Sequence, residues 1–213
     1  MFDHFRPFVH GRVAEIGAGI GMFTERILET PAVEHVVAIE PEPTLADRLR
    51  AIEDPRVEVC AEMLPDAPTL QSQPESFDYV LCQNVLEHIE DDIMAVRAMA
   101  AAVKPGGAMT ILVPAHPWLY GRLDSLYGHH RRYTPARLRV ALDRPGLQVQ
   151  RIYRFNALGI LGWLVKNRQT EPTLDPRSLR VYEQLLKLYR PIEDRVRLPV
   201  GLSLIAHVRK ASR

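Results

Sequence analysis

A cluster of glycines limits what this chain can fold into more than any other feature. The segment Glu15-Ile16-Gly17-Ala18-Gly19-Ile20-Gly21 follows a short apolar run at 12–16. The residues after it, 22–29, have apolar side chains spaced for one face of a helix. Glycines between a strand and a helix let the backbone turn tightly and let a ligand lie against main-chain N–H groups. We therefore predict a ligand site at this turn.

The spacing of the glycines indicates which ligand the turn takes. A dinucleotide-binding turn follows the pattern G-x-G-x-x-G. Counted from Gly17, the last glycine of that pattern falls on Met22. The turn therefore disfavours a nicotinamide dinucleotide, although an NAD(P)-dependent oxidoreductase stays an alternative.

An acidic residue closes the next apolar run. Glu40 follows the run at 35–39. In nucleotide-binding α/β folds, a carboxylate at the end of the second strand accepts hydrogen bonds from ribose hydroxyls. Glu40 therefore predicts a ligand that contains a ribose.

Apolar runs alternate with helical patterns along the first two thirds of the chain. The expected strands are 12–16, 35–39, 56–60, 77–82 and 108–113, and the expected helices are 22–29, 45–52 and 91–103. The last third adds helices at 135–142 and 179–189 and strands at 147–155 and 201–208. Such alternation predicts an α/β fold with seven strands, a mainly parallel sheet and helices on both faces.

Composition restricts the class of protein. The 213 residues are 46% hydrophobic and 25% charged, which is typical of a globular protein, and we predict a single domain over 1–213. The net charge of +1 argues against DNA as a partner and disfavours an RNA acceptor. Two cysteines, Cys60 and Cys82, fit a reducing compartment, and we expect a cytoplasmic protein without a transmembrane segment.

Four motifs in order resemble the class I S-adenosylmethionine-dependent methyltransferases. They are the glycine turn, Ala61-Glu62-Met63, the segment 83–89 (QNVLEHI) and the turn 103–107 (VKPGG). The resemblance covers residues 9 to 114 and implies a Rossmann-like fold with S-adenosylmethionine as cofactor. Residues 201–206 resemble the antiparallel strand that closes the sheet in this family.

The resemblance also implies roles for individual residues. Glu15, Gly17 and Gly19 would line the methionine end of the cofactor, and Glu40 would hold its ribose. Glu62 would flank the adenine, although the family commonly has the shorter Asp there. The full predicted cofactor set is Glu15, Gly17, Ala18, Gly19, Gly21, Glu40, Glu62, Met63 and Asn84.

The segment after the fifth strand is expected to contact the methyl acceptor. Between Arg122 and Arg144 there are six Arg and two Asp, a local balance of +4. Guanidinium groups bind carboxylate or phosphate, so we predict an acceptor with an anionic group. The acceptor would be a small molecule or lipid-linked, and the substrate-binding candidates are Arg131, Arg132, His88, Trp118 and Tyr120.

The chemistry of the acceptor is left open. His129 or His130 could serve as a general base with Tyr133 orienting it, whereas a carboxylate acceptor would need no base. We predict no metal site. The segments 115–135 and 157–198 are candidates for a substrate lid or a dimer contact, and 157–165 also for peripheral contact with a membrane. A catalytically silent protein that binds the cofactor or its demethylated product is the second alternative.

Overall fold

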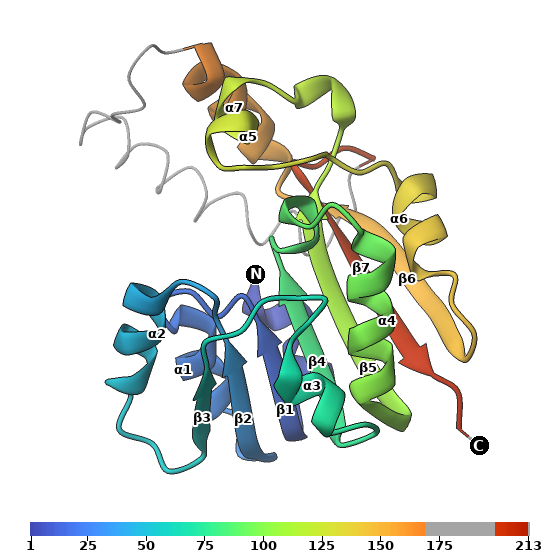
Figure 1. Ribbon diagram of the computed structural model, residues 1–213. Helices are drawn as coiled ribbons and strands as arrows, with labels where there is room; N and C mark the ends of the chain where they lie inside the picture. Colours follow the sequence, from blue (N-terminus) through green and yellow to red (C-terminus); the bar gives the residue numbers. More distant parts are fainter. Residues whose placement is uncertain (169–198, 213) are drawn as a thin grey trace.

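Seven strands form one sheet in the order β3-β2-β1-β4-β5-β7-β6 (Figure 1). The computed structural model describes residues 1–168 and 199–212. The strands are β1 (Gly11–Ile16), β2 (Val33–Ile39), β3 (Val57–Cys60), β4 (Phe77–Gln83), β5 (Val103–Pro114), β6 (Leu147–Phe155) and β7 (Ser203–Lys210). Strands β1 to β5 pair in parallel, and β7 runs antiparallel to both β5 and β6. The predicted mainly parallel sheet with an antiparallel last strand is confirmed.

Helices cover both faces of the sheet. They are α1 (Met22–Leu28), α2 (Pro43–Arg50), α3 (Pro68–Ser72), α4 (Asp92–Ala102), α5 (Arg122–Leu126), α6 (Pro135–Leu142) and α7 (Ala157–Arg168). Helices α3, α4 and α6 pack on one face over a large apolar cluster, and α1 packs on the opposite face with the N-terminal 3-10 turns. Adjacent residues of β1 point to different clusters, Val13 to one and Ala14 to the other. Burial on both faces explains why the strands are nearly continuous apolar runs.

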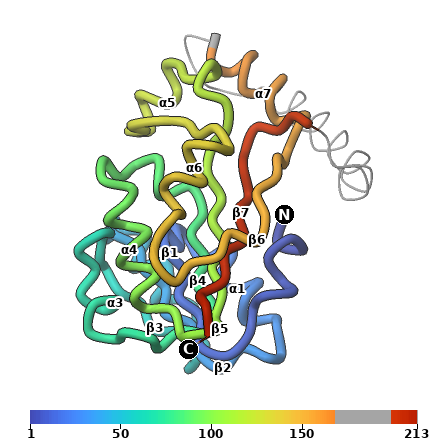
Figure 2. The backbone as a smooth tube through the Cα atoms, turned by 90° about the vertical axis from the view of Figure 1, so that its right-hand side faces the viewer, coloured from blue at the N-terminus to red at the C-terminus, as the bar shows by residue number. Residues whose placement is uncertain are grey.

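The helical additions stand at the carboxyl end of the central strands. Figures 1 and 2 show α5 and α7 side by side beyond the end of β5. A hydrogen bond from the Leu123 N–H to the Asn167 side-chain oxygen, 3.0 Å long, joins the two helices. Helix α7 begins after Asn156, whose side-chain oxygen accepts a hydrogen bond from the N–H of Gly159. These elements frame the edge of the sheet where ligands bind in open α/β folds.

The boundaries of most elements differ from the expected ones by at most two residues. The exception is β5, which begins at Val103, so the turn expected at 103–107 is part of the strand. Helices α3 and α5 were not expected, because five residues are too few to show a helical period. The helix expected at 179–189 lies outside the described residues. No helix in the described parts of the chain is long and apolar enough to cross a membrane.

His207 is a buried imidazole in β7. Its Nδ1 lies 2.9 Å from the Thr110 hydroxyl, its Nε2 lies 3.2 Å from the Tyr153 hydroxyl, and Phe8 stacks on the ring at 4.4 Å. Burial lowers the pKa of His207 to about 4, and the nearby His4 and Arg151 act in the same direction. The fold therefore holds this side chain in the neutral state.

We predict that this histidine makes the fold less stable in acid. Because its pKa is lower in the folded than in the unfolded chain, its stabilising effect is complete above about pH 6.5 and is lost as the pH falls toward 4. The loss is on the order of 3 kcal/mol. Urea unfolding from pH 7 to 4.5 should show a shallower decline for His207→Gln than for the wild type, whereas the exposed His10→Gln should follow the wild type. Parallel curves for all three proteins would contradict the prediction.

Candidate active site

The glycine turn between β1 and α1 is tied to the end of β2. Gly17, Gly19 and Gly21 have φ values of +74°, +59° and +90°, a region that side chains other than glycine rarely adopt. The N–H groups of Gly17 and Ala18 donate to the carbonyl of Ile39. The turn is thus fixed by its conformation and by its neighbour strand.

Glu40 holds the same turn from the other side. Its carboxylate accepts hydrogen bonds from the N–H of Gly19 at 2.8 Å and from the N–H of Glu42 at 3.0 Å. The side chain is 6% exposed. A carboxylate has about four acceptor positions, so two stay available for the hydroxyls of a ligand.

Glu15 is a fully buried acid beside the turn. The Thr24 hydroxyl donates to its Oε2 at 2.6 Å, whereas its Oε1 has no partner. Burial raises the pKa of Glu15 to about 8; the Thr24 hydrogen bond opposes the shift and Glu40 adds to it. A buried oxygen without a partner is costly, and a bound ammonium group would satisfy it.

A cavity of about 430 Å³ opens beside these residues. We call it the cofactor cavity. Its walls include five of the predicted cofactor residues, namely Gly17, Glu40, Glu62, Met63 and Asn84, together with Leu45, Leu64, Val85, His88 and Ile89. Apolar side chains from α2 and from the segments after β3 and β4 therefore complete a site whose polar residues were predicted from the sequence. Such side chains carry no signal of their own in a single sequence.

Ala18 and Glu62, both predicted cofactor residues, are held in place by contacts within the protein. Ala18 packs against Ala38 and Leu49. The carboxylate of Glu62 accepts hydrogen bonds from the N–H and the hydroxyl of Thr69, at 3.0 and 2.7 Å. Glu62 therefore anchors the start of α3 as well as lining the cavity.

A second cavity of about 530 Å³ adjoins the first. We call it the acceptor cavity. Its apolar wall consists of Met1, Leu112, Pro114, Tyr127, Phe155, Trp163 and Leu202, and its polar wall of Asn84, Glu87, His88, His129, Arg132, Asn156 and Ser203. Asn84 and His88 line both cavities. Asn84 follows β4 with a φ of +51°, and its N–H donates to the carbonyl of Leu112.

Three ionisable side chains meet where the cavities join. Glu87, His88 and His129, which we call the Glu87 cluster, bring one donor atom each within 4.8 Å of one another. Glu87 is 1% exposed, and its Oε2 has no partner. Burial raises the pKa of Glu87 to about 8, although Arg132 opposes the shift. Burial and the neighbouring His129 lower the pKa of His88.

A buried carboxylate positions His129. Asp124 is fully buried, and its Oδ1 lies 2.8 Å from both the Nδ1 of His129 and the Nε of Arg132. Its Oδ2 accepts a hydrogen bond from the N–H of Gly121. The guanidinium of Arg132 also donates to the carbonyl of Ala115 and lies 4.3 Å from the centre of the Trp163 ring.

The other predicted acceptor residues have partners within the protein. Arg131 donates to the carbonyls of Ile89 and Glu90, each at 2.7 Å. The buried Tyr133 hydroxyl lies 2.9 Å from Asp92 Oδ2, and burial raises its pKa. The Tyr120 hydroxyl donates to the carbonyl of His129. None of these three side chains, nor His130 or the 65% exposed Trp118, lines either cavity, and their predicted roles remain predictions.

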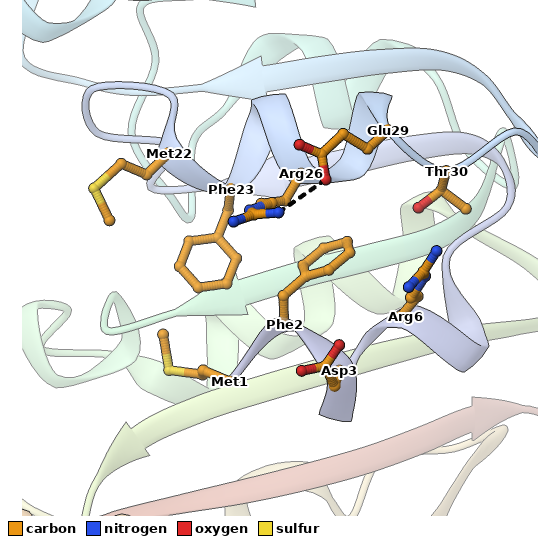
Figure 3. A pocket seen from close by; sticks show the side chains of 9 residues that line it. All are labelled: Met1, Phe2, Asp3, Arg6, Met22, Phe23, Arg26, Glu29 and Thr30. Atoms are coloured by element: carbon orange, nitrogen blue, oxygen red, sulfur yellow. Dashed lines mark hydrogen bonds and ion pairs between the residues drawn. The ribbon is translucent and has the colours of Figure 1, made fainter. Parts of the chain in front are cut away.

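A third cavity, of about 330 Å³, shares Met1 with the acceptor cavity. It separates the N-terminal 3-10 turns from α1 (Figure 3). Figure 3 shows Phe2 and Phe23 facing each other and the ion pair between Arg26 and Glu29. No residue predicted from the sequence to bind cofactor or acceptor lines this cavity. The predicted ligand-binding residues that line a cavity therefore line the first two cavities.

The sheet order is that of a Rossmann-like α/β fold, and two adjoining cavities lie beside its glycine turn. The family model described as "Methyltransferase domain" matches residues 4–152. The chain belongs to this family, the class I S-adenosylmethionine-dependent methyltransferases. Family membership supports S-adenosylmethionine as the cofactor and decides against the nicotinamide alternative.

Curated relatives match part of the chain. A ubiquinone biosynthesis O-methyltransferase from Xanthomonas campestris is 33% identical over 98 residues, which are 46% of this chain and 41% of the relative. A protein with the same description from Xanthomonas euvesicatoria is 28% identical over 152 residues, 65% of this chain and 63% of the relative. The chain thus matches about two fifths to two thirds of the length of these relatives.

Solved structures share the fold. An S-adenosylmethionine-dependent methyltransferase from Mesorhizobium loti has a TM-score of 0.64 at 17% identity, covering 96% of this chain and 93% of its own. The [4+2]-cyclase SpnF has a TM-score of 0.62 at 15% identity, covering 99% and 82%. Because these identities are low, the likeness concerns the fold alone.

We predict that Gly19→Val weakens cofactor binding at least tenfold without unfolding the chain. A valine strongly disfavours a φ of +59°, so the turn and its hydrogen bond to Glu40 would shift. Titration calorimetry with S-adenosylmethionine should show at least a tenfold weaker affinity. The control is Gly146→Val, which puts the same side chain at a φ of +79° in the turn before β6 and has equal room around it. Equal affinity of the two variants would count against this site.

Proposed function

We propose that the protein transfers the methyl group of S-adenosylmethionine to a hydroxyl oxygen of a small molecule with an apolar body. The observation that carries this proposal is the pair of adjoining cavities that share Asn84 and His88. Methyl transfer from a sulfonium is an in-line displacement, so the donor and acceptor atoms must be held side by side. Two neighbouring cavities with one common wall meet that requirement.

The residues of the cofactor cavity fit S-adenosylmethionine. Within the cavity, Glu40 suits the ribose. Glu15 is not among the residues that line the cavity, and its unpartnered Oε1, buried beside the glycine turn, suits the ammonium of the methionine part. Leu45, Met63 and Ile89 provide apolar surface for the adenine. When bound, the cofactor supplies an electrophilic methyl group on a positively charged sulfur.

The two walls of the acceptor cavity indicate the kind of acceptor. One wall is apolar and partly aromatic, with Tyr127, Phe155 and Trp163, and it suits a ring or a hydrocarbon. The polar part of the lining holds the Glu87 cluster, which includes the shared residue His88. An oxygen on an apolar body would lie against this cluster, and the O-methyltransferases among the relatives support oxygen as the accepting atom.

An anionic acceptor has weaker support. Arg131 donates to main-chain carbonyls, and Arg132, which does line the cavity, is paired with Asp124. An anion would compete with an existing buried ion pair. A lipid-linked acceptor fits the proposal through its hydrocarbon part, which would occupy the apolar wall.

Matched acceptors test the proposal. The full chain would be incubated with radiolabelled S-adenosylmethionine and aromatic compounds that differ only in a hydroxyl, an amine or a carboxylate. We expect label in the hydroxyl compounds, with a methyl ether identified by mass spectrometry. Transfer to the amine or carboxylate alone would contradict the oxygen assignment. Tight cofactor binding with no transfer to any compound would favour the silent binding protein.

We further predict that a bulky residue at position 202 blocks the acceptor and spares the cofactor. Leu202 lines the acceptor cavity and does not line the cofactor cavity. Leu202→Trp should raise the acceptor KM at least tenfold while the affinity for S-adenosylmethionine stays within twofold. The matched control is Val200→Trp, because Val200 is 45% exposed and lines neither cavity. An unchanged acceptor KM in Leu202→Trp would refute the assignment of this cavity.

A further inference from the structure

We propose that Glu87, His88 and His129 bind a divalent transition-metal ion at the junction of the two cavities. One donor atom from each residue lies within 4.8 Å of the other two. Metal bonds of about 2.0–2.2 Å hold neighbouring ligand atoms roughly 3–4 Å apart, so a small rotation of the exposed His88 would close the site. No metal site was predicted from the sequence. Glu87 and His88 are adjacent in the sequence, but His129 lies far from them along the chain, so no local spacing joins the three residues.

The donor set indicates which ions fit. Two imidazoles and one carboxylate suit zinc and the neighbouring first-row metals, whereas magnesium and calcium prefer oxygen ligands. Three protein ligands also leave a coordination position open, as in catalytic zinc sites. The open position would face the acceptor cavity, which all three residues line.

The buried carboxyl of Glu87 favours the binding of a cation beside it. Its Oε2 has no hydrogen-bond partner although the residue is 1% exposed. Arg132, whose charge acts on Glu87, is held by Asp124 and by the carbonyl of Ala115. Leaving a buried acid without a partner is costly, and a metal ion would remove that cost.

His129 is oriented as metal-binding histidines usually are. Its Nδ1 lies 2.8 Å from Asp124 Oδ1, which leaves Nε2 to bind the ion. A carboxylate on the second ring nitrogen fixes the tautomer and makes the first a better ligand. Asp124 is fixed in turn by Arg132 and by the N–H of Gly121.

The backbone holds the two halves of the site together. Glu87 and His88 belong to the 3-10 turn Leu86–His88 directly after β4, and His129 belongs to the loop after α5. The N–H of His130 donates to the carbonyl of Glu87 at 2.7 Å. The N–H of His129 donates to the carbonyl of Asp124 at 2.8 Å. The ligands are therefore positioned before any ion binds.

The role of the ion in catalysis rests on the proposed function. The hydroxyl oxygen of the acceptor would occupy the open position, where the positive charge lowers its pKa and its proton passes to water. The oxygen then forms the bond to the methyl carbon as the carbon–sulfur bond breaks and its electron pair moves to sulfur. The binding of the ion itself requires no acceptor and no cofactor.

Metal titration of the full chain tests the site directly. After treatment with a chelator and dialysis, the protein would be titrated with Zn²⁺ by calorimetry, and with Co²⁺ by visible absorption. We expect one ion per chain. Glu87→Gln and His129→Ala should weaken Zn²⁺ binding at least a hundredfold, and Asp124→Asn by about 10- to 100-fold.

The control variant is His130→Ala, which removes the adjacent imidazole and should bind Zn²⁺ as the wild type does. Circular dichroism and S-adenosylmethionine affinity would establish that each variant is folded. Absence of stoichiometric Zn²⁺ binding, equal affinity in all variants, or a loss confined to His130→Ala would overturn the site. Methyl transfer that continues unchanged in the presence of chelator would contradict the catalytic role of the ion and leave the proposed function intact. Metal binding without any methyl transfer would contradict the proposed function and leave the metal site intact.

Discussion

The geometry of the acceptor side depends on one buried ion pair, between Asp124 and Arg132. The two side chains are 0% and 1% exposed, and the Asp124 carboxylate also binds His129 and the start of α5. Breaking a buried pair by removing one partner typically costs about 3–5 kcal/mol, because the other charge stays buried alone. The same interaction thus fixes the loop after α5, the orientation of His129 and one wall of the cavity.

The cofactor side is organised differently. Its polar groups are backbone N–H groups and acids at the ends of β1 and β2, and they are joined directly, since Glu40 binds the N–H of Gly19. Neighbouring parallel strands bring these residues to one edge of the sheet whatever the loops do. The sheet therefore positions the cofactor half of the site, whereas segments added after β5 and β6 position much of the acceptor half.

That difference explains what the sequence could predict. The sheet, and Gly17 and Glu40 of the cofactor cavity, follow from local patterns: apolar runs, a glycine turn and an acid after a strand. Glu62, Met63 and Asn84 follow from the family resemblance, and the apolar lining follows from neither. The acceptor side depends on pairs far apart along the chain, such as Arg137 with Asp92 and Arg131 with the carbonyl of Ile89. The arginine-rich segment consequently appeared as a positive patch for an anion, although many of its charges bind acids and carbonyls of the protein itself. Likewise, no local pattern joins Glu87 to His129.

Trp163 both lines the acceptor cavity and contacts the buried ion pair that stabilises the fold around it. Its ring lies against the guanidinium of Arg132, its indole N–H donates to the carbonyl of Leu119, and it lines the acceptor cavity. A change at this position alters the room for the acceptor and weakens the support of the buried charge pair at once. Evolution toward larger acceptors would therefore proceed more easily through Leu202 or Tyr127 on the same cavity, where size can vary without disturbing that pair.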